Sequence, residues 1–364
     1  MILCSNPSEQ FQSYQTEIEQ AVYSVMRSNS YVLGEQVGLL EQEFAEYIGT
    51  SSAIGVANGT DAIEVALRSL NVGYGDEVIT VSHTAVATVA AIEASGAKAI
   101  LVDIDPKSYT LNPQYLEKVL TKNTKAVIAV HLYGNAVDLD TVLSFCRSNK
   151  LFLIEDVSQA HGAKYKNKRL GSIGDLGCFS CYPTKNLGAI GDAGIVTTNN
   201  LDLADRVRMI REYGWKNRTS MLPGRNSRLD EIQAAILRIK LKYLDSDNQK
   251  RRDIAKFYYE NLSLLPILLP EISSNVEPVF HLFVIQVANQ NKLINFLKKK
   301  GVMAGIHYPL PVHLHPAYKG RVMHSRDMRV TESVVKKIIS LPIYPELSNI
   351  DSKLIVNALN EFFK

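Results

Sequence analysis

The sequence predicts an α/β fold, with a large domain built on a mostly parallel sheet and a smaller α+β domain after it. Short apolar runs alternate with segments whose apolar residues recur at helical spacing, which is the pattern of parallel strands joined by helices. The strand-like runs are 78–81, 99–102, 126–130 and 151–154, and the helical segments are 62–70, 84–95, 113–120 and 138–148. A change of pattern in the later part of the chain indicates the second domain.

That change follows a long helical segment. After a strand-like run at 195–198, the chain is expected to be helical over 201–213 and again from 228 to about 262. The stretch RLDEIQAAILRIKLKYL carries its apolar residues at helical spacing, so we expect one long helix that bridges the two domains. Three prolines, Pro266, Pro270 and Pro278, then precede a further alternation of β and α segments. We therefore expect a large domain over residues 1–245 and a smaller one over 246–364.

Composition and charge argue against two classes of function. The 364 residues are 46% apolar, which is enough for a large core, and the net charge is only +3. The basic run Lys298–Lys300 and the pair Arg251 and Arg252 fit solvated helix faces better than a nucleic-acid surface. No apolar run approaches the roughly 20 residues that span a bilayer, and the amino terminus lacks a signal-peptide pattern. We expect neither nucleic-acid binding nor a membrane role nor export.

Cysteine and histidine usage argues against disulfides and metal binding. Four cysteines are too few and too scattered for a disulfide framework, which fits a reducing cytoplasm. Cys178 and Cys181 form a C-x-x-C pair without the second pair that zinc needs, so we expect strand packing there. His307, His313 and His315 lie close in sequence but without an acidic neighbour. No metal site is expected.

The first candidate for chemistry is Lys185. The stretch GCFSCYPTKNLG, residues 177–188, ends an apolar strand at Ser180 and then presents Lys185 from a short turn stiffened by proline. A lysine amine attacks a carbonyl well only when its surroundings suppress its charge. The small, aromatic and hydroxyl neighbours therefore suggest a Schiff-base lysine, although the same pattern taken alone also fits a solvated loop lysine.

The second candidate is an acidic residue upstream. In LFLIEDVSQAHGA, residues 151–163, an apolar strand ends at Glu155 and Asp156. Ligands of open α/β sheets bind beyond the carboxyl ends of the strands, where a buried carboxylate can meet a cationic ring nitrogen. Pyridoxal phosphate needs such a carboxylate, together with a lysine that holds its aldehyde. A helix N-cap is the alternative role for Asp156.

The third candidate precedes a helix. In VANGTDAIEVAL, residues 56–67, Asn58, Gly59 and Thr60 stand before a helical apolar spacing. Glycine permits close backbone approach, a helix start offers free amides and a positive dipole end, and a threonine hydroxyl adds a donor. These properties suit a phosphate cradle, and ordinary helix capping by Asn58 or Thr60 is the alternative.

Together these segments resemble the DegT/DnrJ/EryC1/StrS family of sugar aminotransferases, a branch of the fold-type I, aspartate aminotransferase-like pyridoxal phosphate enzymes. The resemblance covers nearly the whole chain and implies a mostly parallel seven-stranded sheet in the large domain. The segments that carry it, besides those quoted above, are YVLGEQVGLLEQEFAEYIG (31–49), HLYG (131–134), GRNSRLDEIQAAIL (224–237), HLFVIQV (281–287), HYPLPVH (307–313) and SLPIYPEL (340–347).

The resemblance implies a role for individual residues. Lys185 matches the Schiff-base lysine, Asp156 the partner of the pyridine nitrogen, and Gln159 the residue beside the phenolic oxygen of the cofactor. Gly59, Thr60 and Ser180 match the phosphate site, and Asn226 matches a residue that reaches the same phosphate from the neighbouring subunit of a homodimer.

One position departs from the family pattern. In SHTAVAT, residues 82–88, many members carry an aromatic residue where this chain has Ala85, and that residue covers the pyridine ring. His83 is the nearby planar side chain that can stack instead. A structural histidine before the helix is the alternative.

The expected reaction is transamination. By resemblance the amino donor is L-glutamate and the acceptor is a keto sugar carried on a nucleotide diphosphate, in a cytoplasmic pathway of amino sugar biosynthesis that supplies lipopolysaccharide or another glycan. Basic and hydroxyl side chains suit the diphosphate and the sugar. The candidate substrate residues are Lys216, Arg228, His307, Tyr308 and His313.

The finer specificity rests on subgroup resemblance. YGW at 213–215 and NSRLDEIQAAIL are most similar to enzymes that aminate carbon 3 of thymidine-diphosphate keto-6-deoxy sugars. Amination at carbon 4, as in perosamine-type synthases, and a uridine-diphosphate acetamido sugar are the alternatives. A non-catalytic sensor of sugar nucleotides is a more remote one, because Lys185 and Asp156 are both present.

Overall fold

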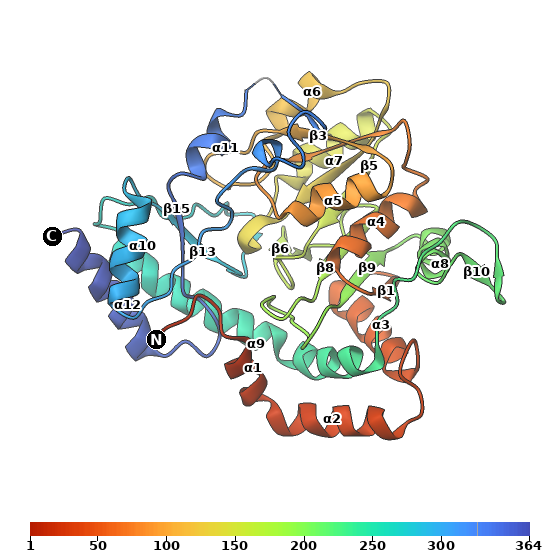
Figure 1. Cartoon of the computed structure of the whole chain (residues 1–364), viewed down its shortest axis with the longest axis horizontal. Coiled ribbons are helices and arrows are strands. Elements are labelled where there is room, and N and C mark those ends of the chain that lie inside the picture. Colours follow the sequence, from red (N-terminus) through yellow and green to blue (C-terminus); the bar gives the residue numbers. More distant parts are fainter. Residues whose placement is uncertain (326) are drawn as a thin grey trace.

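The computed structural model describes residues 1–325 and 327–364, and its largest element is an eight-stranded sheet (Figure 1). Seven strands form the sheet that was expected, and the two-residue β14 adds an eighth at the edge, beside β3. In sheet order the strands are β1 (Ser52–Val56), β9 (Gly194–Thr198), β8 (Leu176–Ser180), β5 (Phe152–Asp156), β4 (Thr124–Val130), β2 (Glu77–Val81), β3 (Lys98–Val102) and β14 (Met323–His324).

The direction of the strands determines where a site can form. All neighbouring pairs from β8 to β14 are parallel, whereas β9 pairs antiparallel with both β8 and β1. The carboxyl ends of β1, β2, β4, β5 and β8 therefore meet at one edge of the sheet. Ligands of such sheets bind beyond that edge. The segments that follow these strands contain Asn58, His83, His131, Gln159 and Lys185.

Helices connect the strands and begin where side chains cap them. Asn58 accepts a hydrogen bond from the amide of Asp61 and caps α4, Asp138 caps α7, and Asn200 caps α8. The sheet is buried on both faces, which explains the nearly continuous apolar runs of its strands. The helices and short helical turns of this part are α3 (Glu35–Ile48), α4 (Gly59–Ser69), α5 (Val86–Ala94), η1 (Pro113–Tyr115), α6 (Leu116–Val119), η2 (Leu132–Gly134), α7 (Leu139–Ser148) and α8 (Leu201–Ile210).

A second core lies in the carboxyl-terminal part of the chain, on the left of Figure 1. Strands β13 (Phe283–Gln286) and β15 (Ile338–Leu341) pair there and pack with α10 (Gln290–Lys299) and α12 (Asn349–Phe362). Val322 and Val334 nevertheless belong to the core of the large sheet. Residues beyond 245 thus contribute to both cores, and the domain boundary at 245 stays a prediction.

Helix α9 (Glu231–Leu262) is the expected long helix, 32 residues in length, and it runs beneath the large sheet toward the second core (Figure 1). Leu237 and Leu244 lie in the first core, and Tyr258 and Leu262 lie in the second. The expectation of a solvated Arg251 is wrong, because its side chain is 4% exposed and donates to the carbonyl of Ile343.

The remaining elements surround these two cores. The hairpin of β10 and β11 projects from the right side of the molecule in Figure 1, and α2 lies along the bottom. Among the described residues, no helix combines the length and the apolar character that crossing a membrane requires. These elements are α1 (Pro7–Ser13), α2 (Gln15–Arg27), β6 (Lys164–Tyr165), β7 (Lys168–Arg169), β10 (Trp215–Lys216), β11 (Thr219–Ser220), β12 (Val276–Glu277), η3 (Val312–Leu314) and α11 (Arg329–Val334).

Candidate active site

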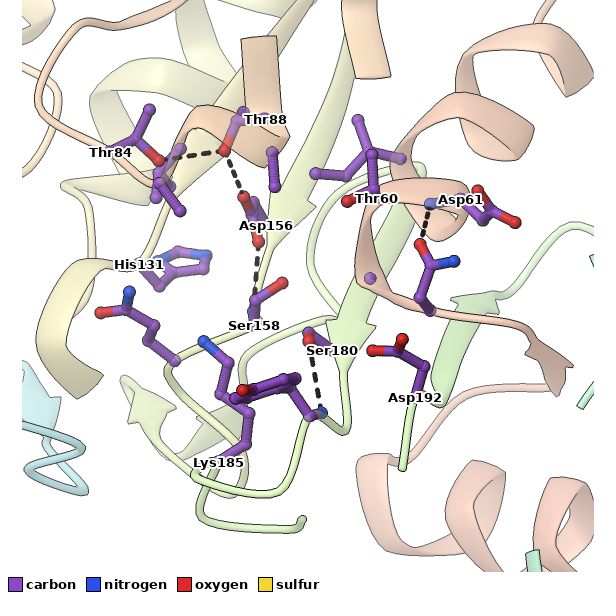
Figure 2. Close-up of a pocket in the computed structure, with 18 residues that line it drawn as sticks. Thr60, Asp61, Thr84, Thr88, His131, Asp156, Ser158, Ser180, Lys185 and Asp192 are labelled. Carbon is purple, nitrogen blue, oxygen red and sulfur yellow. Dashed lines mark hydrogen bonds between the residues drawn. The ribbon is translucent and has the colours of Figure 1, made fainter. Parts of the chain in front are cut away.

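A cavity of about 490 Å³ lies beyond the carboxyl ends of the parallel strands, and Figure 2 shows the residues that line it. Six of these residues are among those predicted to bind the cofactor. The lining residues are Asn58, Gly59, Thr60, Asp61, Ile63, Thr84, Ala85, Ala87, Thr88, Val130, His131, Asp156, Ser158, Gln159, Ser180, Tyr182, Lys185 and Asp192. The fold thus brings Gly59, Thr60, Asp156, Gln159, Ser180 and Lys185 together.

Lys185 reaches this cavity from the turn that follows β8. Its amide donates to the carbonyl of Tyr182 at 2.8 Å, which closes the turn, and its side chain points into the cavity (Figure 2). Burial lowers the pKa of the Lys185 amine to about 8, and the negative charge of Asp156 opposes this effect only in part. About a tenth of the amine is therefore neutral, and nucleophilic, at pH 7, far more than for an ordinary lysine.

Asp156 is the last residue of β5 and is 5% exposed. Thr88 Oγ1 donates to Asp156 Oδ2 at 2.9 Å, and the amide of Ser158 donates to Oδ1 at 3.2 Å. Figure 2 shows the chain of contacts from Thr84 through Thr88 to Asp156. The carboxylate is thus held in one orientation at the cavity wall.

The start of α4 and the end of β8 form a narrow cradle. The first amides of a helix have no partner within the helix, and its dipole is positive at that end. A Cβ on Gly59 would stand 2.9 Å from Ser180 Cα and 3.0 Å from Ser180 Oγ. The absence of a side chain at Gly59 therefore lets the two elements meet, with the hydroxyls of Thr60 and Ser180 on the cavity wall. Asn58 also caps the helix, so both roles considered for this segment are compatible.

Gln159 is fixed by two contacts at the end of β5. The amide of Tyr133 donates to Gln159 Oε1 at 2.8 Å, and Gln159 Nε2 donates to the hydroxyl of Tyr308 at 3.0 Å. The hydroxyl of Tyr133 in turn donates to the carbonyl of His307. His307 and Tyr308 are therefore linked to the cavity through Gln159 and Tyr133, although neither is among the residues that line it.

Other predicted residues lie elsewhere. The imidazole of His83 is fully buried, and its Nε2 lies 2.6 Å from the hydroxyl of Tyr133. Burial lowers the pKa of His83 to about 4. The buried position favours the structural role for His83 over stacking. His313 is also buried, with its Nδ1 2.7 Å from Ser82 Oγ and its Nε2 3.2 Å from Glu332.

Three further predicted residues, Lys216, Asn226 and Arg228, are not among those that line the cavity. Asn226 is exposed, and its side-chain oxygen accepts a 2.9 Å hydrogen bond from Arg228. Lys216 is exposed on the projecting β10–β11 hairpin. The neighbouring Arg225 forms ion pairs with Asp61 and Glu64 of α4, so its guanidinium serves to anchor this segment.

Several lining residues were not predicted from the sequence, among them Thr88 and His131. The amide of Val137 donates to His131 Nδ1 at 3.2 Å, so the ring proton is assigned to Nε2, which faces Glu155 at 3.2 Å. Glu155 is fully buried and also accepts from the amide of Gly171. His131 lies in the segment HLYG and Glu155 at the acidic strand end, and both segments were noted in the sequence. The contact between the two side chains could not be read from it, because 24 residues separate them.

Nearly the whole chain is similar to proteins of one known family. The family model described as "DegT/DnrJ/EryC1/StrS aminotransferase family" matches residues 12–360. The chain belongs to the DegT/DnrJ/EryC1/StrS aminotransferase family. This finding confirms the resemblance and the fold class, and the enzyme is an aminotransferase whose cofactor is pyridoxal phosphate.

Two relatives and one solved structure match this aminotransferase over nearly its full length. It is 43% identical to a dTDP-3-amino-3,6-dideoxy-alpha-D-galactopyranose transaminase from Aneurinibacillus thermoaerophilus, over 96% of each chain. It is 40% identical to a dTDP-3-amino-3,4,6-trideoxy-alpha-D-glucose transaminase from Streptomyces venezuelae, over 97% of this chain and 93% of the relative. The crystal structure of S. venezuelae DesV, in complex with a ketimine intermediate, superimposes with a TM-score of 0.97 at 39% identity and covers 100% of this chain and 98% of that one.

The groups in the cavity fit the cofactor of the family. Pyridoxal phosphate offers an aldehyde, a basic ring nitrogen and a phosphate. The cavity offers a lysine amine with a lowered pKa, a buried carboxylate held by two hydrogen bonds, and a helix start that only glycine allows to approach β8. Each part of the cofactor thus has a chemically suitable counterpart on the wall of one cavity.

Proposed function

We propose that this enzyme transfers the amino group of L-glutamate to carbon 3 of a dTDP-linked keto-6-deoxy sugar. The observation that carries the proposal is the shared cavity of Lys185, Asp156 and the Gly59–Ser180 cradle. The two relatives named above support the dTDP nucleotide and amination at carbon 3, because the name of each relative contains a dTDP-3-amino sugar. The product is an amino sugar on its nucleotide carrier.

Lys185 supplies the catalytic amine. When bound, the cofactor supplies an aldehyde that accepts the amino group and a ring that withdraws electrons from the reacting carbon. The Lys185 amine holds that aldehyde before the donor arrives, and afterwards its Nζ removes the proton from the donor α-carbon. Both tasks require the neutral amine, which the lowered pKa of about 8 makes accessible.

Asp156 faces the ring nitrogen in this proposal. Its carboxylate keeps the nitrogen protonated, so that the ring stays electron-poor during proton transfer. Thr88 and the amide of Ser158 orient the carboxylate. Gly59, Thr60 and Ser180 hold the phosphate at the start of α4, where free amides and the helix dipole favour an anion. Gln159 would lie beside the phenolic oxygen of the bound cofactor.

The sugar nucleotide is proposed to bind outside the cofactor. Tyr308 is the better supported contact, because Gln159 holds its hydroxyl at the edge of the cavity. His307 is the second candidate contact, because its carbonyl accepts a hydrogen bond from the hydroxyl of Tyr133. Lys216 and Arg228 are proposed for the diphosphate. His313 stays a weaker candidate, since both of its ring nitrogens have partners within the protein.

A homodimer with shared active sites belongs to the same proposal. Asn226 is exposed and is not among the residues that line the cavity of its own chain, so its side chain is accessible to a partner subunit. The cysteines Cys4, Cys146, Cys178 and Cys181 carry no disulfide, which is compatible with the predicted cytoplasmic location.

A panel of keto sugar nucleotides with L-glutamate tests the substrate. We expect turnover of a dTDP-3-keto-6-deoxy sugar, with the new nitrogen found on carbon 3 by NMR of the product. A product aminated at carbon 4, or turnover confined to uridine-diphosphate acetamido sugars, would replace this substrate by one of the alternatives. Lys185→Ala is expected to abolish turnover and the visible absorbance change that L-glutamate causes. A change in the visible absorbance of the wild-type protein on addition of L-glutamate would exclude the alternative of a non-catalytic sensor.

A further inference from the structure

Helix α9 carries a row of buried polar side chains beneath the Lys185 turn. Lys240, Asp247, Asn248 and Arg251 are 3%, 3%, 1% and 4% exposed, and their spacing puts them on one face of the helix. Burial of a polar group costs free energy unless the group is hydrogen-bonded. The hydrogen-bond partners of these side chains therefore show which segments the helix face contacts.

Lys240 has two partners, and both are neutral. Its Nζ donates to the carbonyl of Gly188 at 2.7 Å and to Gln10 Oε1 at 2.9 Å. Within the described part of the chain, Lys240 forms no salt bridge. Burial lowers its pKa to about 8. The carboxylates of Glu346 and Asp247 offset this effect of burial only in part. Burial of an ammonium group is unfavourable, and an apolar side chain of the same length would avoid this cost. Stability alone therefore does not account for a lysine here.

The partners of Lys240 lie on the structure that presents Lys185. Gly188 ends the turn three residues after Lys185, and Gln10 belongs to α1. Asn186, the residue next to Lys185, donates to Asn248 Oδ1 at 2.8 Å, so α9 contacts the turn at two points. Residues of α1 and of the turn also line one small cavity together.

We propose that Lys240 is a positioning residue, which ties the Lys185 turn to α9 and α1 and thereby sets where the Lys185 amine stands in the active site. The inference rests on the proposed catalytic role of Lys185. Displacement of a reacting group by about 1 Å can cost about a hundredfold in rate, so a contact at the base of the turn has a large effect on the amine.

Lys240→Met tests the proposal, since methionine keeps the apolar stem and removes the donor. Lys242→Met is the matched control, because Lys242 lies on the solvent side of the same helix, with its side chain 60% exposed. Three quantities are measured on the holoenzyme: the single-turnover rate with L-glutamate, the pH midpoint of the visible absorbance of the bound cofactor, and Tm. Lys240→Arg tests whether another cationic donor rescues the first two.

We expect K240M to lower the single-turnover rate about 10- to 100-fold and to shift the absorbance midpoint, with partial recovery in K240R and no change in K242M. A K240M protein with the wild-type rate and midpoint would overturn the proposal, whatever its Tm. If K240M does not fold, Gln10→Leu removes the tie to α1, and an unchanged rate and midpoint in that variant overturn the proposal as well. Turnover by K185A would contradict the proposed function as well. An inactive K185A together with a K240M of wild-type behaviour would contradict only the role of Lys240.

Discussion

Thr88 Oγ1 donates a 2.9 Å hydrogen bond to Oδ2 of Asp156, and both side chains are buried. The two residues lie on different elements, since Thr88 belongs to α5 and Asp156 ends β5. The contact fixes the carboxylate that we propose to face the ring nitrogen of the cofactor. A hydrogen bond to a charged group contributes about 1.5–3 kcal/mol, which makes this contact measurable by substitution.

Thr88→Val removes the donor at nearly constant volume. We expect the affinity of the apoenzyme for pyridoxal phosphate to fall about tenfold, because the variant leaves one oxygen of a buried carboxylate without its partner. Fluorescence titration of the apoenzyme with the cofactor measures the change. Thr88→Ser keeps the hydroxyl and is the matched control. Equal affinities of T88V and wild type would show that Asp156 needs no support from α5.

The pH dependence of the first half-reaction follows from Lys185. Burial lowers the pKa of its amine to about 8, and only the neutral amine acts as a base. The single-turnover rate with L-glutamate is therefore expected to fall as the pH drops below about 8, and to level off above it. Rapid-mixing absorbance measurements over a pH series give the profile. A rate that is constant through this region would mean that a different group moves the proton.

Gly59→Ala tests the cradle. Its Cβ would stand 2.9 Å from Ser180 Cα, so the start of α4 must move away from β8. We expect weaker binding of cofactor and of inorganic phosphate, with a loss of about 1–3 kcal/mol in the free energy of unfolding from overpacking. The matched control is Gly38→Ala on α3, where no atom lies within 4 Å of the added Cβ. G38A should be at least as stable as wild type, because alanine favours helix.

Mixing two inactive variants tests the shared active site. A heterodimer of Lys185→Ala and Asn226→Ala contains one site in which both residues are intact, if Asn226 serves the partner's cofactor. Random exchange of subunits should then restore about a quarter of the wild-type activity. Size-exclusion chromatography confirms that the subunits exchange. If exchanged mixtures stay inactive, although N226A alone is impaired, Asn226 serves its own chain.

The predicted site residues that line the cavity are those that sit next to a strand end or a helix start. Asp156, Ser180 and Lys185 follow from where apolar runs stop, because a parallel sheet gathers its carboxyl ends at one edge. Gly59 and Thr60 follow from the capping pattern before α4. In these cases the position in the element determines the place in the fold, whereas the chemical role of each residue rested on the family resemblance.

The predicted residues that do not line the cavity include two histidines held by distant partners. His313 is held by Ser82, which is 231 residues away in the sequence, and the pairing of His83 with Tyr133 spans 50 residues. Element boundaries show the same limit on a smaller scale: the helix expected over 84–95 runs from Val86 to Ala94. The edge strand β14 has only two residues, so periodicity could not reveal it.

The uninterrupted helix α9 also has a consequence for how the molecule melts. It supplies Leu237 and Leu244 to one core and Tyr258 and Leu262 to the other, over a length of about 48 Å. If either core loses its packing, part of this helix becomes exposed. Loss of helix in that part removes backbone hydrogen bonds that support the neighbouring turns, which belong to the other core. The two cores should therefore unfold cooperatively, as one calorimetric transition, even though each has its own set of apolar contacts.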